Sequence, residues 1–303
     1  MLTMISFTRY RKIYFIFSAT LILASIASFV VFGFNLGIDF TGGSILEITY
    51  QGDRPSNQEI LDNLKEIELG TVTVQPTDNN GIILKFKDVD EEIHQQILEN
   101  LQKQDATGIE EKRFESIGPT IGKELKDKTK IVAILVLLSI VLYIAFAFRK
   151  VQRPLRSWQY GIVSILALFH DILIPLGIFS VLGKIYDIEI TIPVITAFLA
   201  ILGYSVNNTV VVFDRIRENL LTGGGAFEDV IDKSLNQTLA RQINTSLTTL
   251  FVVSAIFILG GETLKYFALA LSLGIIAGTY SSFFLAGSIL LTWFNRKDRQ
   301  RKK

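Results

Sequence analysis

Six long runs of this sequence are almost entirely apolar, and they restrict the fold more than any other feature. A helix needs about 20 residues, with a range of about 17–25, to cross the hydrocarbon core of a bilayer. The length of 303 residues would otherwise suit one or two soluble domains. The mean hydropathy of +0.40 favours the membrane instead. We predict a polytopic α-helical membrane protein with six transmembrane helices, at 13–34, 131–148, 160–182, 190–213, 239–259 and 266–294.

The composition excludes several classes of protein. The net charge of +1 gives no general electrostatic attraction for nucleic acid, and the absence of Cys excludes disulfides, thiol catalysis and Cys-ligated metals. Only two histidines are present, and His94 is expected to be an ordinary surface or boundary residue. No H-E-x-x-H or Ser–His arrangement occurs, and Gly203-Tyr-Ser205 lacks the rest of a nucleophile elbow. We therefore predict no enzyme, no metal and no cofactor.

Residues 39–118 are predicted to form a small α+β domain between the first and second spans. Apolar and polar residues alternate over 46–50, as in a strand with one buried face. Ser56 and Glu59 have the spacing of a capping box at the start of a helix. The segment 78–81, Asp-Asn-Asn-Gly, is a hairpin signal. Further strands near 72–74, 82–86 and 109–117, and a second helix capped by Asp90, complete a ferredoxin-like β-α-β-β-α-β order.

Basic residues flank the second, fourth and sixth spans at the same side of the membrane. The positive-inside rule therefore predicts that both termini are cytoplasmic and that the α+β domain is external. The basic residues are Arg149, Lys150, Arg153, Arg156, Arg215, Arg217, Arg296, Lys297, Arg299, Arg301, Lys302 and Lys303. The predicted parts are 1–38 (N-terminal segment and first span), 39–118 (external domain), 119–294 (five further spans with cytoplasmic loops) and 295–303 (basic cytoplasmic tail).

Polar residues inside the predicted spans are the candidate functional residues. Lipid offers them no hydrogen bonds, so we expect them to face other helices or a water-filled cavity. Asp171 follows His170 in the third span, where a carboxylate costs at least about 2.5–3.5 kcal/mol. It either bonds a neighbouring helix structurally or stays neutral and carries a proton. The fourth span contributes Tyr204, Ser205, Asn207, Asn208 and Thr209.

A polar stripe on the fifth span contains Arg241. Its guanidinium stays protonated, so it needs an anion, a dipole or water; the alternative is that it snorkels to the cytoplasmic headgroups. After the fourth span, Arg215 and Glu218 are expected to pair at a solvated helix end. Small residues at 274, 278 and 282 are expected to let a neighbouring helix approach closely. The stripe consists of Ser234, Thr238, Arg241, Thr245 and Thr248.

Five stretches resemble the SecF family, the smaller subunit of the SecD–SecF protein-export complex. They occur in the order of the family and cover almost the whole chain. At fold level the family is similar to the resistance-nodulation-division transporters. The stretches are GIDFTGGS at 37–44, SIGPTIG at 116–122, AxxHD at 167–171, GYSVNNTVVVFDRIREN at 203–219 and QTLARQINTS at 237–246, with Asp39, Gly42, Gly43, Asp214 and Arg215 as signature residues.

The resemblance implies partners and an energy source that composition does not show. It implies a pseudo-symmetric unit with SecD beside the SecYEG channel, in a bacterial inner membrane or a thylakoid membrane where the source has one. That unit would use the proton gradient, and no cofactor, to move preproteins after the ATPase SecA has pushed them. The proton path would lie among the polar groups of the fourth and fifth spans.

One position departs from the family pattern. Asn208 stands where the family usually has a membrane-embedded Asp, which is expected to respond to protons together with the Arg matched by Arg241. Asn cannot titrate. Three explanations are open: the carboxylate comes from SecD alone, Asp171 takes over, or the sequence was engineered to arrest the cycle. We also predict that Arg241 is hydrated or meets another carboxylate.

Two other classes of function compete with this one. Half of a proton-driven small-molecule exporter of the same superfamily would also need intramembrane polar groups. The small external domain argues against it, because drug-type relatives carry larger ones. An intramembrane enzyme lacks any supporting motif in the sequence.

Overall fold

The computed structural model describes residues 5–77, 80–103, 108–149, 155–222 and 225–301. The contacts divide the chain into two compact units, one formed by Met1–Asn35 with Ala133–Lys303 and the other by Leu36–Val132. Within the described residues, six helices are long and apolar enough to cross a membrane. The predicted six-helix membrane fold is therefore confirmed.

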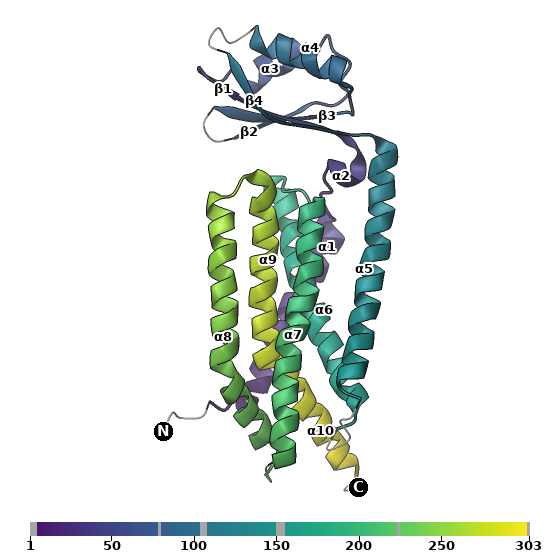
Figure 1. The fold of residues 1–303 in the computed structure, drawn as a ribbon, viewed down its shortest axis with the longest axis vertical. Coiled ribbons are helices and arrows are strands. Elements are labelled where there is room, and N and C mark those ends of the chain that lie inside the picture. Colours follow the sequence, from purple (N-terminus) through teal and green to yellow (C-terminus); the bar gives the residue numbers. More distant parts are fainter. Residues whose placement is uncertain (1–4, 78–79, 104–107, 150–154, 223–224, 302–303) are drawn as a thin grey trace. The chain divides into compact units, whose positions relative to one another are not determined.

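Figure 1 shows the helices of the bundle, and all but α1 are longer than the predicted spans. α8 begins well before residue 239 because its first turns form an amphipathic extension, in which acidic residues alternate with buried Phe227, Ile231 and Leu235. The last span is a continuous helix interrupted by a π-helical segment, η2. The elements are η1 (Thr8–Tyr10), α1 (Arg11–Phe32), α5 (Pro119–Ala147), α6 (Ser157–Tyr186), α7 (Ile192–Thr222), α8 (Phe227–Leu259), α9 (Glu262–Tyr280), η2 (Ser281–Ala286) and α10 (Gly287–Arg301).

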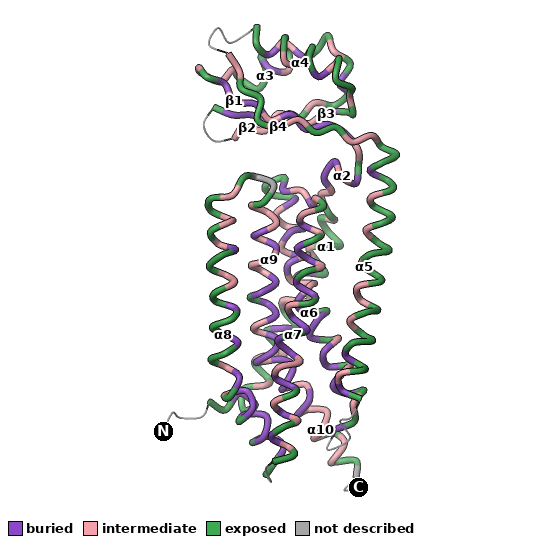
Figure 2. Tube along the Cα trace, viewed as in Figure 1, coloured by how far each residue is buried: buried purple, intermediate pink, exposed green. Residues whose placement is uncertain are grey.

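Helices α6, α7 and α9 form the centre of the bundle. Figure 2 shows buried residues along these three helices, whereas α1, α5 and α8 are largely exposed. Close approach depends on small residues, as predicted for the last span. A Cβ added at Gly274 would lie 2.2 Å from Cδ1 of Ile201, and one added at Gly278 would lie 3.3 Å from Cβ of Ser205. On α6, a Cβ added at Gly177 would also overlap Ser25 of α1, at 2.5 Å from its Cα.

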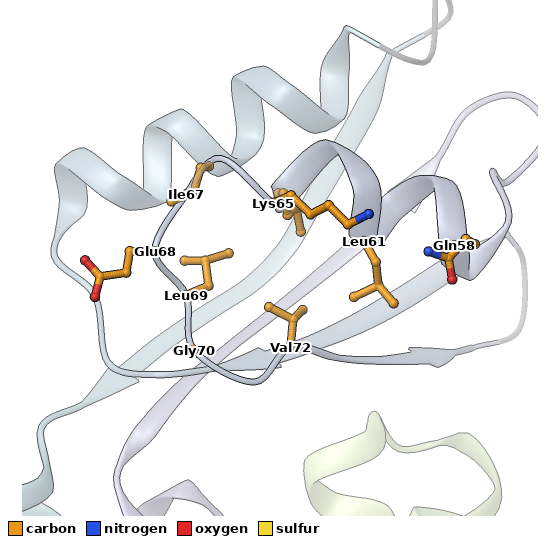
Figure 3. A pocket seen from close by; sticks show the side chains of 9 residues that line it. Gln58, Leu61, Lys65, Ile67, Glu68, Leu69, Gly70 and Val72 are labelled. Carbon is orange, nitrogen blue, oxygen red and sulfur yellow. The ribbon is translucent and has the colours of Figure 1, made fainter.

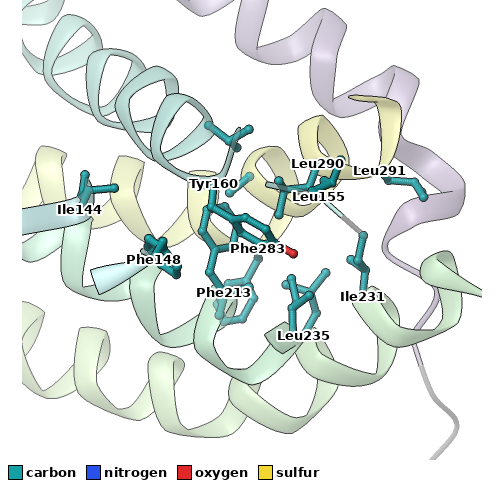
Figure 4. Close-up of a cluster of buried hydrophobic side chains, with 14 of the residues drawn as sticks. Ile144, Phe148, Leu155, Tyr160, Phe213, Ile231, Leu235, Phe283, Leu290 and Leu291 are labelled. Carbon is teal, nitrogen blue, oxygen red and sulfur yellow. The ribbon is translucent and has the colours of Figure 1, made fainter. Parts of the chain in front are cut away.

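An aromatic cluster fills the bundle where the end of α5, the start of α6 and the end of α7 meet (Figure 4). The Phe213 ring makes edge contacts with Tyr160 at 5.4 Å and with Phe148 at 5.8 Å. Such edge-to-face pairs add about 0.5–1.5 kcal/mol to the burial energy. This part of the bundle is therefore held by apolar packing, in contrast to the polar layer described below.

The N-terminal segment is fastened to α8. The Asp232 carboxylate accepts hydrogen bonds from the Thr8 amide at 2.9 Å and from the Thr8 hydroxyl at 2.8 Å. It thereby caps the first turn of the first span with negative charge, where the helix dipole is positive. The Asn236 amide group exchanges two hydrogen bonds with the Ile5 backbone.

The second unit is a four-stranded antiparallel sheet with two main helices. The strand order β2-β3-β1-β4 confirms the ferredoxin-like prediction. Strands β2 and β3 pair as the hairpin signal implied, although residues 78–79 lie outside the described part of the chain. The elements are α2 (Ile38–Thr41), β1 (Gly43–Tyr50), α3 (Asn57–Leu64), β2 (Thr73–Pro76), β3 (Gly81–Phe86), α4 (Glu91–Gln102) and β4 (Ile109–Ile117).

The backbone conformation at the start of β1 requires glycine at positions 42 and 43. Gly42 and Gly43 have φ values of +78° and +125°, which residues with a Cβ atom rarely adopt. A Cβ on Gly42 would lie 2.9 Å from the Cα of Pro119, and one on Gly43 would lie 2.9 Å from the carbonyl oxygen of Phe86. The signature glycines therefore permit a tight turn into the sheet.

The expectation for His94 was wrong. Its side chain is only 4% exposed, and its ring stacks on Phe114 at 3.7 Å. Nδ1 lies 3.2 Å from Glu91, and Nε2 lies 3.4 Å from Glu111 on β4. The residue is buried because it shares a helix face with the core residue Ile97, so that it points at the sheet.

The capping box at α3 is confirmed and has a pH-dependent consequence. The Ser56 hydroxyl accepts from the Glu59 amide, and the Glu59 carboxylate accepts from the Ser56 amide at 2.8 Å. These bonds, led by the one from the Ser56 backbone, lower the pKa of Glu59. A lowered folded-state pKa gives stability that is present above the ordinary pKa of 4.5 and is lost as the pH falls through the folded value.

We therefore expect Glu59→Gln to speed amide exchange in α3 at neutral pH. The difference from the unmodified chain should disappear in acid, where both side chains are neutral. Hydrogen–deuterium exchange of Asn57–Leu64 measures this in the full chain. The matched control is Glu66→Gln, an exposed residue just after the helix, which should change nothing. A difference that persists unchanged in acid would contradict the assignment.

Candidate functional site: a polar layer inside the bundle

A buried carboxylate lies at the centre of the polar layer. Asp171 on α6 is 0% exposed and the adjacent His170 is 1% exposed. The His170 Nδ1 lies 2.8 Å from Asp171 Oδ1. Oδ2 accepts hydrogen bonds from the hydroxyl of Ser205 on α7 and, at 2.7 Å, from that of Ser281 at the start of η2. Both alternatives considered for Asp171 need such partners, because an unpaired carboxylate is costly in this environment.

His170 retains one free ring nitrogen. Among the described residues, no partner lies within hydrogen-bond distance of its buried Nε2. The ring stacks on Tyr280 of α9 at 5.8 Å, and the Tyr280 hydroxyl donates to the Tyr14 carbonyl on α1 at 3.3 Å. The His170–Asp171 pair is thus enclosed by α1, α7 and α9, with one unused donor or acceptor for a proton or water.

A second cluster surrounds Asn208. The Gln242 side chain on α8 donates to the Asn208 backbone carbonyl at 2.9 Å and accepts from the Ser282 hydroxyl at 3.0 Å. Asn208 is 3% exposed, and within the described part of the chain its side-chain nitrogen and the Thr209 hydroxyl are buried without partners. The region around position 208 is therefore polar and incompletely satisfied.

A third cluster begins at Tyr204. Its hydroxyl donates to Ser246 on α8 at 3.0 Å, and Ser246 lies 2.7 Å from the Thr279 hydroxyl on α9. Thr279 in turn donates to the Ile275 carbonyl at 2.7 Å. Three hydrogen-bonded chains from α6, α7 and α8 thus end on one short stretch, at Thr279, Ser281 and Ser282. This stretch is the point where the last span changes from α-helix to π-helix.

The structure brings together only some of the predicted site residues. Asn207, Arg241 and Thr245 are exposed rather than part of the buried layer. Thr245 donates to the Arg241 backbone carbonyl, and no described side chain pairs with the Arg241 guanidinium. Asn208 points inward while Arg241 lies on the outer face of α8. The prediction that Arg241 is hydrated or meets another carboxylate remains a prediction.

Four members of the layer were not predicted from the sequence, and Ser282 was predicted only to allow close helix packing. Gln242 and Ser246 are four residues apart, which places them on one helix face. The hydroxyl run Thr-Tyr-Ser-Ser at 279–282 interrupts an otherwise apolar span. These were the available signals, but hydroxyl groups in membrane helices usually bond their own backbone. The missed residues are Gln242, Ser246, Thr279 and Ser281.

The charged end of α7 is a helix-surface network. The predicted pair Arg215–Glu218 is present at 2.5 Å, and Arg215 also donates to Gln237 of α8 at 2.8 Å. Asp214 pairs with Arg217 at 3.3 Å. The bond from Arg215 to Gln237 joins α7 to α8 beyond the buried layer, whereas the two ion pairs lie within α7. The remaining signature residue, Asp39, lies in α2 of the other unit.

A separate pocket of about 430 Å³ lies in the α+β unit (Figure 3). It is formed by α3 and the loop that follows it, and its lining combines apolar side chains with the polar side chains of Gln58, Lys65 and Glu68. Among the described residues, no group of three or more His, Cys, Asp or Glu side chains could hold a metal. The pocket residues are Gln58, Leu61, Leu64, Lys65, Ile67, Glu68, Leu69, Gly70 and Val72.

Comparison with known families identifies the kind of protein to which this layer belongs. The family described as protein export membrane protein SecD/SecF, C-terminal, matches residues 96–296, and the SecD/SecF GG motif matches residues 27–53. The protein translocase subunit SecF of Thermobaculum terrenum is 38% identical, over 97% of this chain and 95% of its own. This chain belongs to the SecF family. The SecF of Rhodothermus marinus is 40% identical, over 98% of this chain and 95% of its own.

Solved SecDF structures share the fold. The crystal structure of SecDF from Thermus thermophilus, described as a translocon-associated membrane protein, superimposes with a TM-score of 0.81 at 30% identity. It covers 97% of this chain, which spans only 39% of the SecDF chain. SecDF in a super-membrane-facing form gives a TM-score of 0.71 at 33% identity. A SecF-family chain therefore corresponds to one part of the longer SecDF protein.

Proposed function

We propose that this SecF-family chain pairs with a SecD subunit and couples the proton-motive force to late preprotein translocation. Relatives that cover nearly all of the chain are named protein translocase subunits, and the Thermus relative combines SecD and SecF in one name. The complex would act beside the SecYEG channel, on preproteins delivered by SecA. It would do so without catalysis of its own and without a cofactor.

The proposed location is the bacterial inner membrane, or a thylakoid membrane where the source has one. Both termini would be cytoplasmic and the α+β unit would lie on the other side. The basic residues after α5, after the apolar part of α7 and in α10 support this orientation. Asn207 on α7 and Arg241 and Thr245 on α8 are exposed polar residues within apolar spans, and a SecD partner would cover them.

The observation that carries the proposal is the buried His170–Asp171 pair. Ionisable groups inside membrane helices are expensive, and they commonly mark proton relays. Asp171 is fully enclosed and is bonded by hydroxyls from two other helices, one of them at the start of a π-helix. The Asn208 side chain has no titratable group, so it cannot bind and release a proton. We therefore assign the coupling carboxylate of this chain to Asp171.

Asn208→Asp tests this assignment directly. We expect the stimulation of translocation by the proton-motive force to change less than about twofold, because coupling runs through Asp171. The measurement is preprotein translocation into inverted membrane vesicles that contain this chain, SecD and the channel. A several-fold gain for the Asp variant would instead place the proton site at position 208. Failure of the chain to co-purify with SecD would remove the functional proposal altogether.

A further inference from the structure

The start of η2 has hydroxyl groups with two alternative acceptors each. The Ser281 hydroxyl lies 2.7 Å from Asp171 Oδ2 and 3.2 Å from the Gly278 carbonyl. The next residue, Ser282, lies 3.0 Å from Gln242 Oε1 and 2.9 Å from the Thr279 carbonyl. Each hydroxyl has a single proton to donate, so each can satisfy only one acceptor at a time.

We propose that this α-to-π junction is a hydroxyl switch that reports the protonation state of Asp171 to the cluster around Asn208. Ser281 is its positioning residue, and Ser282 passes the change to Gln242. This inference rests on the proposed function and adds how a proton at Asp171 alters the helix bundle. It assigns a role to the π-helix, a form that is rare and often found at functional sites.

The proton balance of the switch is simple. With Asp171 ionised, Ser281 donates to Oδ2, as the structure shows. When one proton binds Oδ2, the carboxyl group becomes a donor; in the proposed switch it donates to Ser281, while the Ser205 hydroxyl continues to donate to Oδ2. The Ser281 hydrogen then rotates to the Gly278 carbonyl. One proton is taken up, no other bond to hydrogen is broken, and release reverses the sequence.

The π-helical register makes this rotation consequential. The Ser281 amide is shared between the carbonyls of Ala277 and Gly278, so the hydroxyl competes for an acceptor that the backbone also uses. When the Ser281 hydroxyl also donates to the Gly278 carbonyl, the Ser281 amide is therefore expected to bond more to the Ala277 carbonyl. Gly278 also keeps a side chain away from the Asp171 carboxylate, since an added Cβ there would lie 3.5 Å from Asp171 Oδ2.

The groups that face Asp171 can be named helix by helix. His170 on α6 contacts its other oxygen, Tyr280 on α9 stacks on His170, and the Tyr280 hydroxyl reaches Tyr14 on α1. The apolar parts of α1, α7 and α9 contain no Asp, Glu, Lys or Arg. Arg241 on α8 is exposed and pairs with no described side chain. Asp171 is thus the carboxylate to which Ser281 responds.

The switch predicts a pH-dependent distance that Ser281 controls. Because the chain contains no Cys, spin labels at Leu221→Cys on α7 and Arg299→Cys on α10 are unambiguous in a complex with cysteine-free SecD. Electron-electron double resonance should show a distance distribution that shifts between alkaline and acidic buffer. Asp171→Asn should give the acidic distribution at both pH values, since its amide donates to Ser281 as the protonated acid would.

Three serine variants distinguish a switching role of the Ser281 hydroxyl from a purely structural role. Ser281→Ala should lose the pH-dependent shift. Ser205→Ala removes the other hydroxyl bond to Oδ2, but from an unbroken α-helix, so the shift should remain with a moved midpoint. Ser164→Ala is the matched control, because within the described residues this buried hydroxyl bonds only its own helix, at the Tyr160 carbonyl. Its distance distribution should shift with pH in the same way as that of the unmodified chain.

Two results would overturn the inference: a Ser281→Ala complex that shifts like the unmodified one, or an unmodified complex that translocates but shows no shift. If Asp171→Asn abolishes proton-driven translocation while Ser281→Ala keeps the shift, the proposed function stands and the switch fails. If Asp171→Asn translocates normally, the coupling assignment itself fails. Co-purification with SecD confirms that each variant is folded.

Discussion

Asp171→Asn should reduce the stimulation of translocation by the proton-motive force about tenfold or more, equivalent to at least about 1.4 kcal/mol of lost coupling. Asn preserves the size of the side chain and can donate to Ser281, but it cannot bind and release a proton. Translocation driven by ATP alone should continue, because the ATPase is a separate component in the proposed scheme. The measurement is vesicle translocation with and without a proton gradient.

Asp187→Asn is the matched control for this experiment. Asp187 directly follows the C-terminal end of α6, is exposed and has a positive φ of 58°, which Asn also tolerates. It should leave the stimulation unchanged. If Asp171→Asn and Asp187→Asn behaved alike, the buried carboxylate would have only a structural role, which was the alternative left open by the sequence.

Gly177→Ala should strongly destabilise the packing of α1 on α6. The added Cβ would lie 2.4 Å from Cβ and 2.5 Å from Cα of Ser25, so a backbone has to move rather than a flexible side chain. Overpacking of this kind costs about 1–3 kcal/mol or more. The shift would also strain the bonds from the Ser180 hydroxyl to the Ser28 carbonyl at 3.0 Å and the Gly33 carbonyl at 2.7 Å. The melting temperature of the purified chain in detergent should fall by several degrees.

Gly203→Ala is the control for that substitution. Gly203 also lies within a helix, but apart from its own turn of backbone no heavy atom of the described chain lies within 4 Å of an added Cβ. Its only expected effect is the higher helix propensity of Ala, up to about 1 kcal/mol in favour of folding. Equal melting temperatures for the two variants would show that α1 can move away from α6 without loss.

Much of the architecture could be predicted because local patterns determine it. Uncharged runs identify spans in any bilayer, and the Ser56–Glu59 capping box begins α3 as expected. The helix ends were less predictable. The first turns of α8 contain Glu228, Asp229 and Asp232, which lower the hydropathy even though Phe227 and Ile231 are buried. Tertiary contacts, rather than composition, decide where that helix begins.

The polar layer was predicted only in part, for a different reason. A charged residue such as Asp171 is conspicuous in an apolar run, whereas Ser281 resembles every other serine in a membrane helix. Its partner is 110 residues away in the sequence, so no local pattern connects the two. The π-helical turn has no sequence signature of its own. His94 was misjudged likewise, because its burial depends on the position of β4.

The exposed guanidinium of Arg241 has a consequence for how the protein accumulates in cells. Under the proposed pairing, a chain without SecD presents a permanent positive charge on an apolar helix, close to lipid. Such an orphan subunit is less stable in the bilayer than the assembled pair, and cellular proteolysis removes unstable species first. The scarcer subunit would then set the abundance of the complex, so that stoichiometry is maintained without any dedicated regulator.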